Sequence, residues 1–375
     1  MFDTTFIRNA INRSAESPLD RRRFIRAAGL TSVGVGAATL LTAPEASAAD
    51  SGAVTDGAIL NFALNLEYLE AEFYARATTG AGLPDSMTTG TGTRGGVTGG
   101  RKVTFKTTSI RQYAEEITKD ERNHVAFLRT ALGGAAVARP TINLDASFTG
   151  AAMAAGLIKT GEKFDPYANE QNFLLAAFIF EDVGVTAYKG AAPLVSNKTF
   201  LSAAAGILAA EAYHAGLIRT SLYNMGLQAP AGKISDARDS LDGPSDLDQG
   251  IVSSTGGANI VPLDANGVAF GRTPGQVLNI VYLNPKPVTK GGFFPDGVNG
   301  ALKQSGGGSA SAGAGTMPSG GAATGAGGTA EGRSTELLVG GVVAAAGAVA
   351  AAGAYQHSKK DSADAVSKTD GIAAV

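Results

Sequence analysis

The chain contains the ten-residue stretch ERNHVAFLRT at residues 121–130 and a second version of it, EAYHAGLIRT, at residues 211–220. In each copy a glutamate is followed three residues later by a histidine, so both side chains project from one face of a helix. Apolar residues and Arg-Thr follow at matching positions. A single Glu-x-x-His is more often part of a solvent-exposed helix face. Two matched copies instead indicate metal ligands.

The composition limits the kinds of site that the chain can build. It carries 31 Lys and Arg against 33 Asp and Glu, and this net charge of -2 gives no reason to expect nucleic-acid binding. The chain has no cysteine, which excludes disulfides, thiolate metal sites and cysteine nucleophiles. Any metal must therefore be held by oxygen and imidazole ligands.

The first 48 residues predict an export signal. Residues 20–26, DRRRFIR, are typical of a twin-arginine motif, and an apolar run leads from there to a small-residue cleavage site at residues 46–48. We expect export in the folded state by the twin-arginine pathway, to the periplasm or the cell surface. An uncleaved N-terminal anchor is the alternative.

The C-terminal end predicts a linker followed by an anchor. Residues 304–333 are rich in Gly, Ala, Ser and Thr and cannot form a core, so a flexible linker is expected. Residues 337–354 are then 18 consecutive positions without a charge, the minimum for a transmembrane helix, and Lys359-Lys360 follow. The sequence favours a C-terminal anchor in the inner membrane over a soluble or self-associating helix.

Four long helices are predicted from the 3.6-residue period and its capping signals, at residues 56–77, 109–132, 166–191 and 197–224. Asp56 and Ser109 are the expected N-caps of the first two, and Pro166 is expected in the first turn of the third. The inward faces carry a single glutamate in the first and third helices and a Glu-x-x-His pair in the second and fourth: Glu67, Glu181, Glu121 with His124, and Glu211 with His214. An uncompensated buried carboxylate costs many kcal/mol, so these side chains require a cation.

The order of these residues describes a duplicated helix pair. A helix with one glutamate precedes a helix with Glu-x-x-His, and the pair recurs after a connection, residues 133–165, long enough to cross one end of a bundle. Tyr74 follows Glu67 by seven residues, and Tyr188 follows Glu181 by the same interval. Four carboxylates and two imidazoles would meet at mid-bundle, where two divalent cations neutralise the glutamates.

The other segments are predicted to surround the bundle. Residues 78–108 form a Gly/Thr-rich insert, expected to be a surface excursion or a lid, with a weak hairpin signal at 97–107. One short helix is expected from Thr273-Pro274, and Phe293-Phe294 are expected to pack on the bundle. The chain is thus divided into an export signal (1–48), a bundle (50–228), an extension (229–303), a linker (304–333) and an anchor with its tail (334–375).

Four more charged residues of the predicted helices are expected to lie outside the set of metal ligands. Glu70 and Glu72 are interpreted as solvent-facing or supporting groups. Arg129 and Arg219, in the two copies of the opening stretch, are expected to form ion pairs near helix ends.

The arrangement resembles the ferritin-like superfamily of dinuclear carboxylate proteins, and more narrowly the secreted ferritin-like and desiccation-related proteins. The narrower resemblance rests on NFALNLEYLEAEFY at residues 61–74, RTPGQVLNIVYL at residues 272–283 and GGFFP at residues 291–295. It covers about residues 50–300. It implies an all-α fold, a ferritin-like four-helix bundle with a long crossover and an irregular C-terminal extension.

The resemblance also implies roles for the repeated residues. Glu67 and Glu181 would be single-helix ligands, Glu121 and Glu211 bridging carboxylates, and His124 and His214 terminal imidazoles, one for each of two metal ions. Many relatives place an acid before each Glu-x-x-His to orient a histidine. Here Asp120 does so in the first copy, but Ala210 occupies the position in the second. Tyr74 and Tyr188 are expected to pack as aromatics, with a hydrogen-bonding or redox role beside the metals as the alternative.

The sequence therefore predicts an exported dinuclear-metal protein whose substrates are Fe(II) and oxygen or peroxide. Carboxylate-rich ligation favours Fe, with Mn as the second choice. Two alternatives stay open: a dimanganese site that disproportionates peroxide, as a catalase does, and a non-catalytic desiccation, stress or surface protein with a structural metal. A homo-oligomer is left open, whereas a closed storage cage is disfavoured by the insert and the tail.

Overall fold

The structure is a computed structural model, and it describes residues 54–306. The predicted export signal, most of the predicted linker and the predicted membrane anchor lie outside the described residues.

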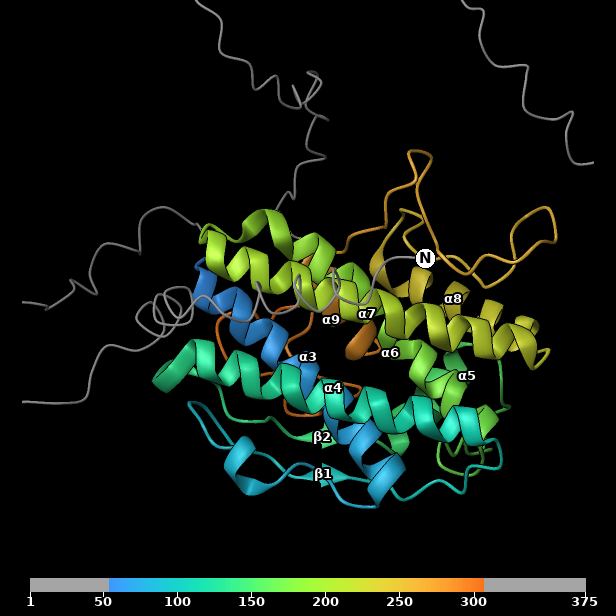
Figure 1. The fold of residues 1–375 in the computed structure, drawn as a ribbon, viewed down its shortest axis with the longest axis horizontal. Helices are drawn as coiled ribbons and strands as arrows, with labels where there is room; N and C mark the ends of the chain where they lie inside the picture. Colours follow the sequence, from blue (N-terminus) through green and yellow to red (C-terminus); the bar gives the residue numbers. More distant parts are fainter. Residues whose placement is uncertain (1–53, 307–375) are drawn as a thin grey trace, which may run out of the picture. The chain divides into compact units, whose positions relative to one another are not determined.

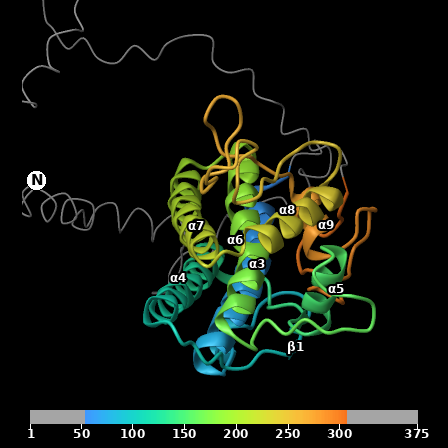
Figure 2. The same ribbon diagram turned by 90° about the vertical axis from the view of Figure 1, so that its right-hand side faces the viewer.

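Four long helices form the bundle that the sequence predicts (Figure 1). They are α3 (Asp56–Thr79), α4 (Thr108–Leu132), α6 (Glu170–Ala191) and α7 (Lys198–Asn224). The closest packing is between α3 and α4 and between α6 and α7, so the bundle consists of two helix pairs joined by a crossover. Figure 2 shows α4 and α7 on one side of the molecule, while the extension and crossover cover α3 and α6 from the other.

The starts of the helices differ in detail from those predicted. Thr55, not Asp56, caps α3, and the Asp56 carboxylate instead accepts hydrogen bonds from the backbone N–H groups of Ser196 and Asn197 at the start of α7. Thr107 replaces Ser109 as the N-cap residue of α4. The third helix begins at Glu170 rather than Pro166, because the Asn169 side chain accepts the hydrogen bond from the Asn172 N–H that caps it.

The insert pairs with the crossover instead of folding on itself. Strand β1 (Val97–Thr98) lies parallel to β2 (Ile142–Asn143), so the predicted hairpin at 97–107 is wrong. The crossover also contains α5 (Ala146–Ala154). The end of the insert is attached to α6, since the Glu170 carboxylate accepts hydrogen bonds from the N–H groups of Lys106 and Thr107, both at 2.9 Å.

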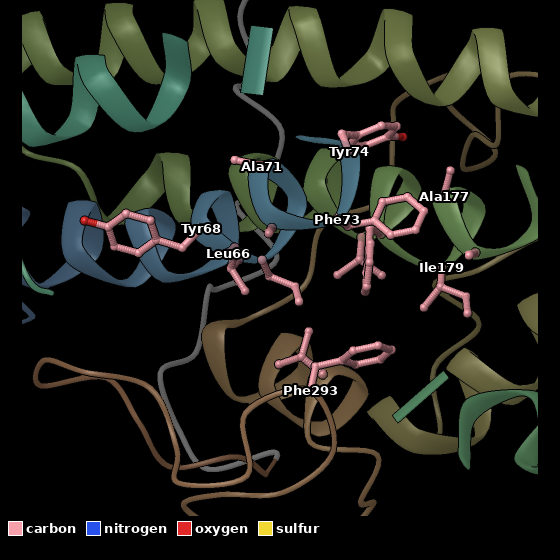
Figure 3. Close-up of a cluster of buried hydrophobic side chains, with 14 of the residues drawn as sticks. Leu66, Tyr68, Ala71, Phe73, Tyr74, Ala177, Ile179 and Phe293 are labelled. Atoms are coloured by element: carbon pink, nitrogen blue, oxygen red, sulfur yellow. The ribbon is translucent and has the colours of Figure 1, made fainter. Parts of the chain in front are cut away.

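The extension packs on the bundle, as predicted. Helix α9 (Pro274–Val281) begins at the expected residue, where Thr273 and Gln276 form a capping box. The Phe293 ring lies 5.0 Å from that of Phe148 and 4.9 Å from that of Phe180, measured between centroids. Figure 3 shows Phe293 facing the buried apolar cluster of the bundle. Helix α8 (Gln228–Asp242) was not predicted.

A buried ionic network attaches the extension to α6 and α7. Arg219 of α7 donates to Asp182 of α6 at 2.7 Å, which confirms the predicted ion pair for this arginine. Further pairs continue the network into the extension: Arg238 with Asp182 and Asp248, and Arg272 with Asp242 and Asp248. Arg129 does not form the corresponding ion pair and donates instead to the Tyr68 hydroxyl at 2.6 Å.

Candidate metal centre

The structure brings the six predicted ligands together in the middle of the bundle. One or two come from each of the four long helices: Glu67 from α3, Glu121 and His124 from α4, Glu181 from α6, Glu211 and His214 from α7. All four glutamates are buried. Their atoms form two overlapping groups, each within 4.8 Å and each able to hold a metal ion: Glu67, Glu121, His124 and Glu211, and then Glu121, Glu181 and His214.

Each group is centred on the Nδ1 atom of one histidine. His124 Nδ1 lies 3.2 Å from Glu67 Oε2, and His214 Nδ1 lies 3.5 Å from Glu181 Oε2. We call Glu67 with His124 the His124 half of the site and Glu181 with His214 the His214 half. Glu121 joins them, because its Oε2 is 3.4 Å from His124 Nδ1 and its Oε1 is 3.1 Å from His214 Nδ1. Glu211 Oε1 lies 3.7 Å from His124 Nδ1.

The atoms that face the middle of this cluster make no hydrogen bonds. They are one or both carboxylate oxygens of every glutamate and the Nδ1 atom of each histidine: Glu67 Oε2, Glu121 Oε1 and Oε2, Glu181 Oε2, Glu211 Oε1 and Oε2, His124 Nδ1 and His214 Nδ1. Buried polar atoms are normally satisfied, because leaving one unpaired costs about 1–3 kcal/mol. Carboxylate oxygens and imidazole nitrogens are ligands suited to Fe and Mn ions. The residues therefore fit a metal centre.

The two tyrosines hold the outer oxygens of the single-helix glutamates. Tyr74 of α3 donates its hydroxyl hydrogen to Glu181 Oε1 of α6, and Tyr188 of α6 donates to Glu67 Oε1 of α3. Burial raises the pKa of both hydroxyls well above the ordinary value, so they remain donors. Of the two roles left open by the sequence, hydrogen bonding is thus present in addition to packing. These hydrogen bonds leave Glu67 Oε2 and Glu181 Oε2, the atoms without hydrogen bonds, available to hold a metal ion.

Asp120 contacts the histidine of the other copy. Its Oδ2 lies 3.3 Å from His214 Nε2, on the side of the ring opposite the atom that faces the cluster. The side chain is 35% exposed, so it connects the ring to the surface. The predicted orienting acid is therefore present, and it reaches from α4 of one helix pair to His214 on α7 of the other, and not to His124.

Glu70 is a fifth buried carboxylate at the site. Of the two interpretations given to Glu70 and Glu72, exposure to solvent is wrong for both, and a supporting position beside the cluster is correct for Glu70. Glu72 is fully buried and pairs with Arg76 and Arg139. Glu70 is 6% exposed, and its Oε1 ends 3.5 Å from the point where a Cβ atom on Gly184 of α6 would stand. Its spacing of three residues from Glu67 repeats the Glu-x-x-His interval, and that signal could have identified it.

The pKa shifts within the cluster favour protons on Glu67, Glu211 and His124. Burial raises the pKa of Glu67 to about 7 and that of Glu211 well above the ordinary value. Glu121 has the opposite shift: burial opposes its ionisation, but the two imidazoles beside it lower its pKa to about 2. Burial alone would lower the pKa of His124, whereas Glu67 and Glu121 raise it to about 11. A bound cation would take the place of these protons.

Gly184 makes room for the cluster, which gives a first prediction. A Cβ atom at this position would stand 2.2 Å from Glu211 Oε2, so Gly184→Ala should displace that carboxylate and weaken metal binding by about 10-fold or more, judging from changes around other metal sites. Metal titration of the purified variant measures this. Gly216→Ala on α7 is the matched control, because nothing lies within 4 Å of its added Cβ. Equal affinity in the two variants would contradict the prediction.

Comparison with known proteins agrees with this geometry. A family model described as a ferritin-like domain matches residues 55–224. The chain is 33% identical over 270 residues to the desiccation-related protein PCC13-62 of Craterostigma plantagineum, which covers 66% of this chain and 83% of that protein. It is 27% identical over 262 residues to the ferritin-like catalase Nec2 of Nesocodon mauritianus, which covers 65% of this chain and 83% of that protein. No solved structure matches the chain.

Proposed function

Because this chain belongs to the ferritin-like, desiccation-related protein family, we propose that it is an exported dinuclear-metal protein that oxidises or sequesters Fe(II) and reduces oxygen or peroxide. One observation carries this proposal: four buried glutamates and two histidines direct atoms without hydrogen bonds into one small volume. Export rests on the N-terminal motif alone.

The ligand set supports two ions of a hard metal. Glu121 has one oxygen near each histidine, so it is placed to bridge two ions, with Glu67 and His124 on one and Glu181 and His214 on the other. Oxygen-rich ligation with imidazole favours Fe or Mn. We propose iron as the resident metal.

Two Fe(II) ions would supply one electron each, which with two protons reduce O₂ to hydrogen peroxide or reduce one hydrogen peroxide to two waters. The protein's part is positioning and exclusion of water. Tyr74 and Tyr188 fix the terminal carboxylates, and Asp120 fixes the His214 ring. The T-shaped contact of Tyr74 with Phe173, 5.7 Å between centroids, belongs to the apolar shell that separates the site from solvent.

Peroxide disproportionation is the second candidate, and the similarity to a protein named as a ferritin-like catalase favours it. Two manganese ions held by the same six residues would take one peroxide to oxygen and another to two waters. The ligands do not separate the two reactions, since both need two adjacent ions and carboxylate bridges.

The decisive experiment begins with metal analysis of the purified protein. We expect two ions per chain and, after anaerobic loading with Fe(II), oxidation of the iron with consumption of oxygen or peroxide. Rapid oxygen release from peroxide by the Mn-loaded protein would instead support the catalase reaction. Two bound ions without turnover in either assay would contradict both enzymatic proposals and leave a stress protein with a structural metal.

A further inference from the structure

The two halves of the metal centre are unequal in what supports their histidines. Asp120 immediately precedes Glu121 in the first copy of the repeat, and its carboxylate contacts His214 Nε2 at 3.3 Å. The corresponding residue before Glu211 is Ala210, which has no polar side-chain atom. Among residues 54–306, the structure gives His124 Nε2 no hydrogen-bond acceptor.

The repeat also differs at the position three residues after each single-helix glutamate. Glu70, three residues after Glu67 on α3, corresponds to Gly184, three residues after Glu181 on α6. The Glu70 carboxylate reaches α6 beside Gly184, where Glu211 also lies, so this difference concerns the whole cluster and not one half of it.

Outer carboxylates matter at metal sites because they fix the histidine ring and raise the basicity of the ligating nitrogen, and losing one typically costs 10–100-fold in metal affinity. A ring without such a partner is free to turn about its bond to Cβ. His124 is in this position, and it is also 12% exposed on its side chain.

We propose that the His214 half, whose imidazole contacts Asp120, holds its ion tightly. The His124 half is the exchangeable metal position, because Ala210 occupies the position in the second repeat that corresponds to Asp120. The inference rests on the proposed metal centre and adds an order of loading. The first ion enters the His214 half, and the second enters the His124 half at higher concentration.

Titration of the metal-free full chain with Mn(II), with the free ion counted by electron paramagnetic resonance, tests this without an activity assay. The wild-type protein should bind two ions with dissociation constants at least about 10-fold apart. Asp120→Ala should weaken the tighter ion by about 10–100-fold and leave the weaker one unchanged, and Asp120→Asn, which keeps an acceptor oxygen, should recover part of the loss.

Ala210→Asp should tighten the weaker ion by about 10-fold, because it supplies the missing carboxylate. Ala209→Asp is the matched control, because Ala209 is the exposed neighbour of Ala210 on α7 and the variant introduces the same charge there. Three results would overturn the proposed difference between the halves while leaving the metal centre in place. They are two ions of equal affinity in the wild type, an Asp120→Ala effect confined to the weaker ion, and equal effects of Ala210→Asp and Ala209→Asp. No binding by the wild type would overturn the proposed function with it.

Discussion

Glu121→Ala should lower the rate of Fe(II) oxidation or peroxide loss by at least about 100-fold, more than the loss of an outer partner costs at other metal sites. Glu121 is the one carboxylate in the described cluster with an oxygen within 3.4 Å of each histidine Nδ1. Its removal disconnects the two halves and leaves both imidazoles without their shared anion. His214→Ala should have a comparable effect, since it removes the imidazole of one half. Stopped-flow measurement of the metal-loaded protein gives both rates.

The matched control for this prediction is Glu116→Ala. Glu116 lies on the same helix α4 but is exposed, so the variant makes the same chemical change away from the cluster. It should keep the wild-type rate and two bound ions. A Glu121→Ala protein that turns over within threefold of this control would show that the reaction takes place elsewhere.

The bundle and the cluster could be predicted because both depend on local sequence. A helical period decides which residues share a face, and the repeated spacing of Glu and His decides which faces must meet. Glu67 and Glu181 were identified as inward carboxylates on this basis. In the structure each of these glutamates accepts a hydrogen bond from the tyrosine on the helix of the other. Tyr74 of α3 donates to Glu181, and Tyr188 of α6 donates to Glu67.

The burial of Glu70 could not be decided from the sequence because the helical period separates inside from outside only where a helix has a solvent-exposed face. Nearly every residue in the middle of α3 is buried, since the crossover and the extension cover the side that would otherwise face water (Figure 2). The start of α6 was misjudged for a similar reason. Pro166 lies in a local turn, where the Asp165 side chain accepts a hydrogen bond from the Tyr167 N–H. Arg101 of the insert, far away in sequence, donates to the Tyr167 carbonyl and holds this turn outside the helix.

The partner of strand β1 could not be predicted because the pairing is not local. Val97 pairs with Ile142, far along the crossover, and a two-residue strand has no period of its own. The histidine that Asp120 contacts likewise depends on tertiary structure. The sequence places the acid on α4, but only the packing of α4 against α7 directs it to His214.

Removal of the metal should lower the melting temperature of the protein by roughly 10–20 °C. An ion present at 100 times its dissociation constant stabilises the native state by about 2.7 kcal/mol, so two ions contribute about 5 kcal/mol. For a domain of this size each kcal/mol corresponds to about 2–4 °C. Thermal unfolding followed by circular dichroism, with excess Mn(II) or with a chelator, measures the difference. Glu121→Ala should show little difference between the two conditions.

The same difference should be larger at pH 8 than at pH 5, because the metal-free site depends on protons. The folded pKa of Glu67 is raised from 4.5 to about 7, so the stability from its protonation is full below pH 4.5 and is lost as the pH rises through 7. His124 is raised from 6.5 to about 11, so its contribution is full below pH 6.5 and declines above it. Both contributions fall between pH 5 and pH 8.

The metal-loaded protein should lack this dependence, because bound cations would take the place of the protons. Metal affinity itself should increase with pH, because fewer protons compete for the ligands. The melting temperatures with and without metal should therefore separate as the pH rises. A gap that stays constant from pH 5 to pH 8 would show that the buried glutamates are neutralised by something other than exchangeable protons, and a gap that closes would mean that the metal binds outside this cluster.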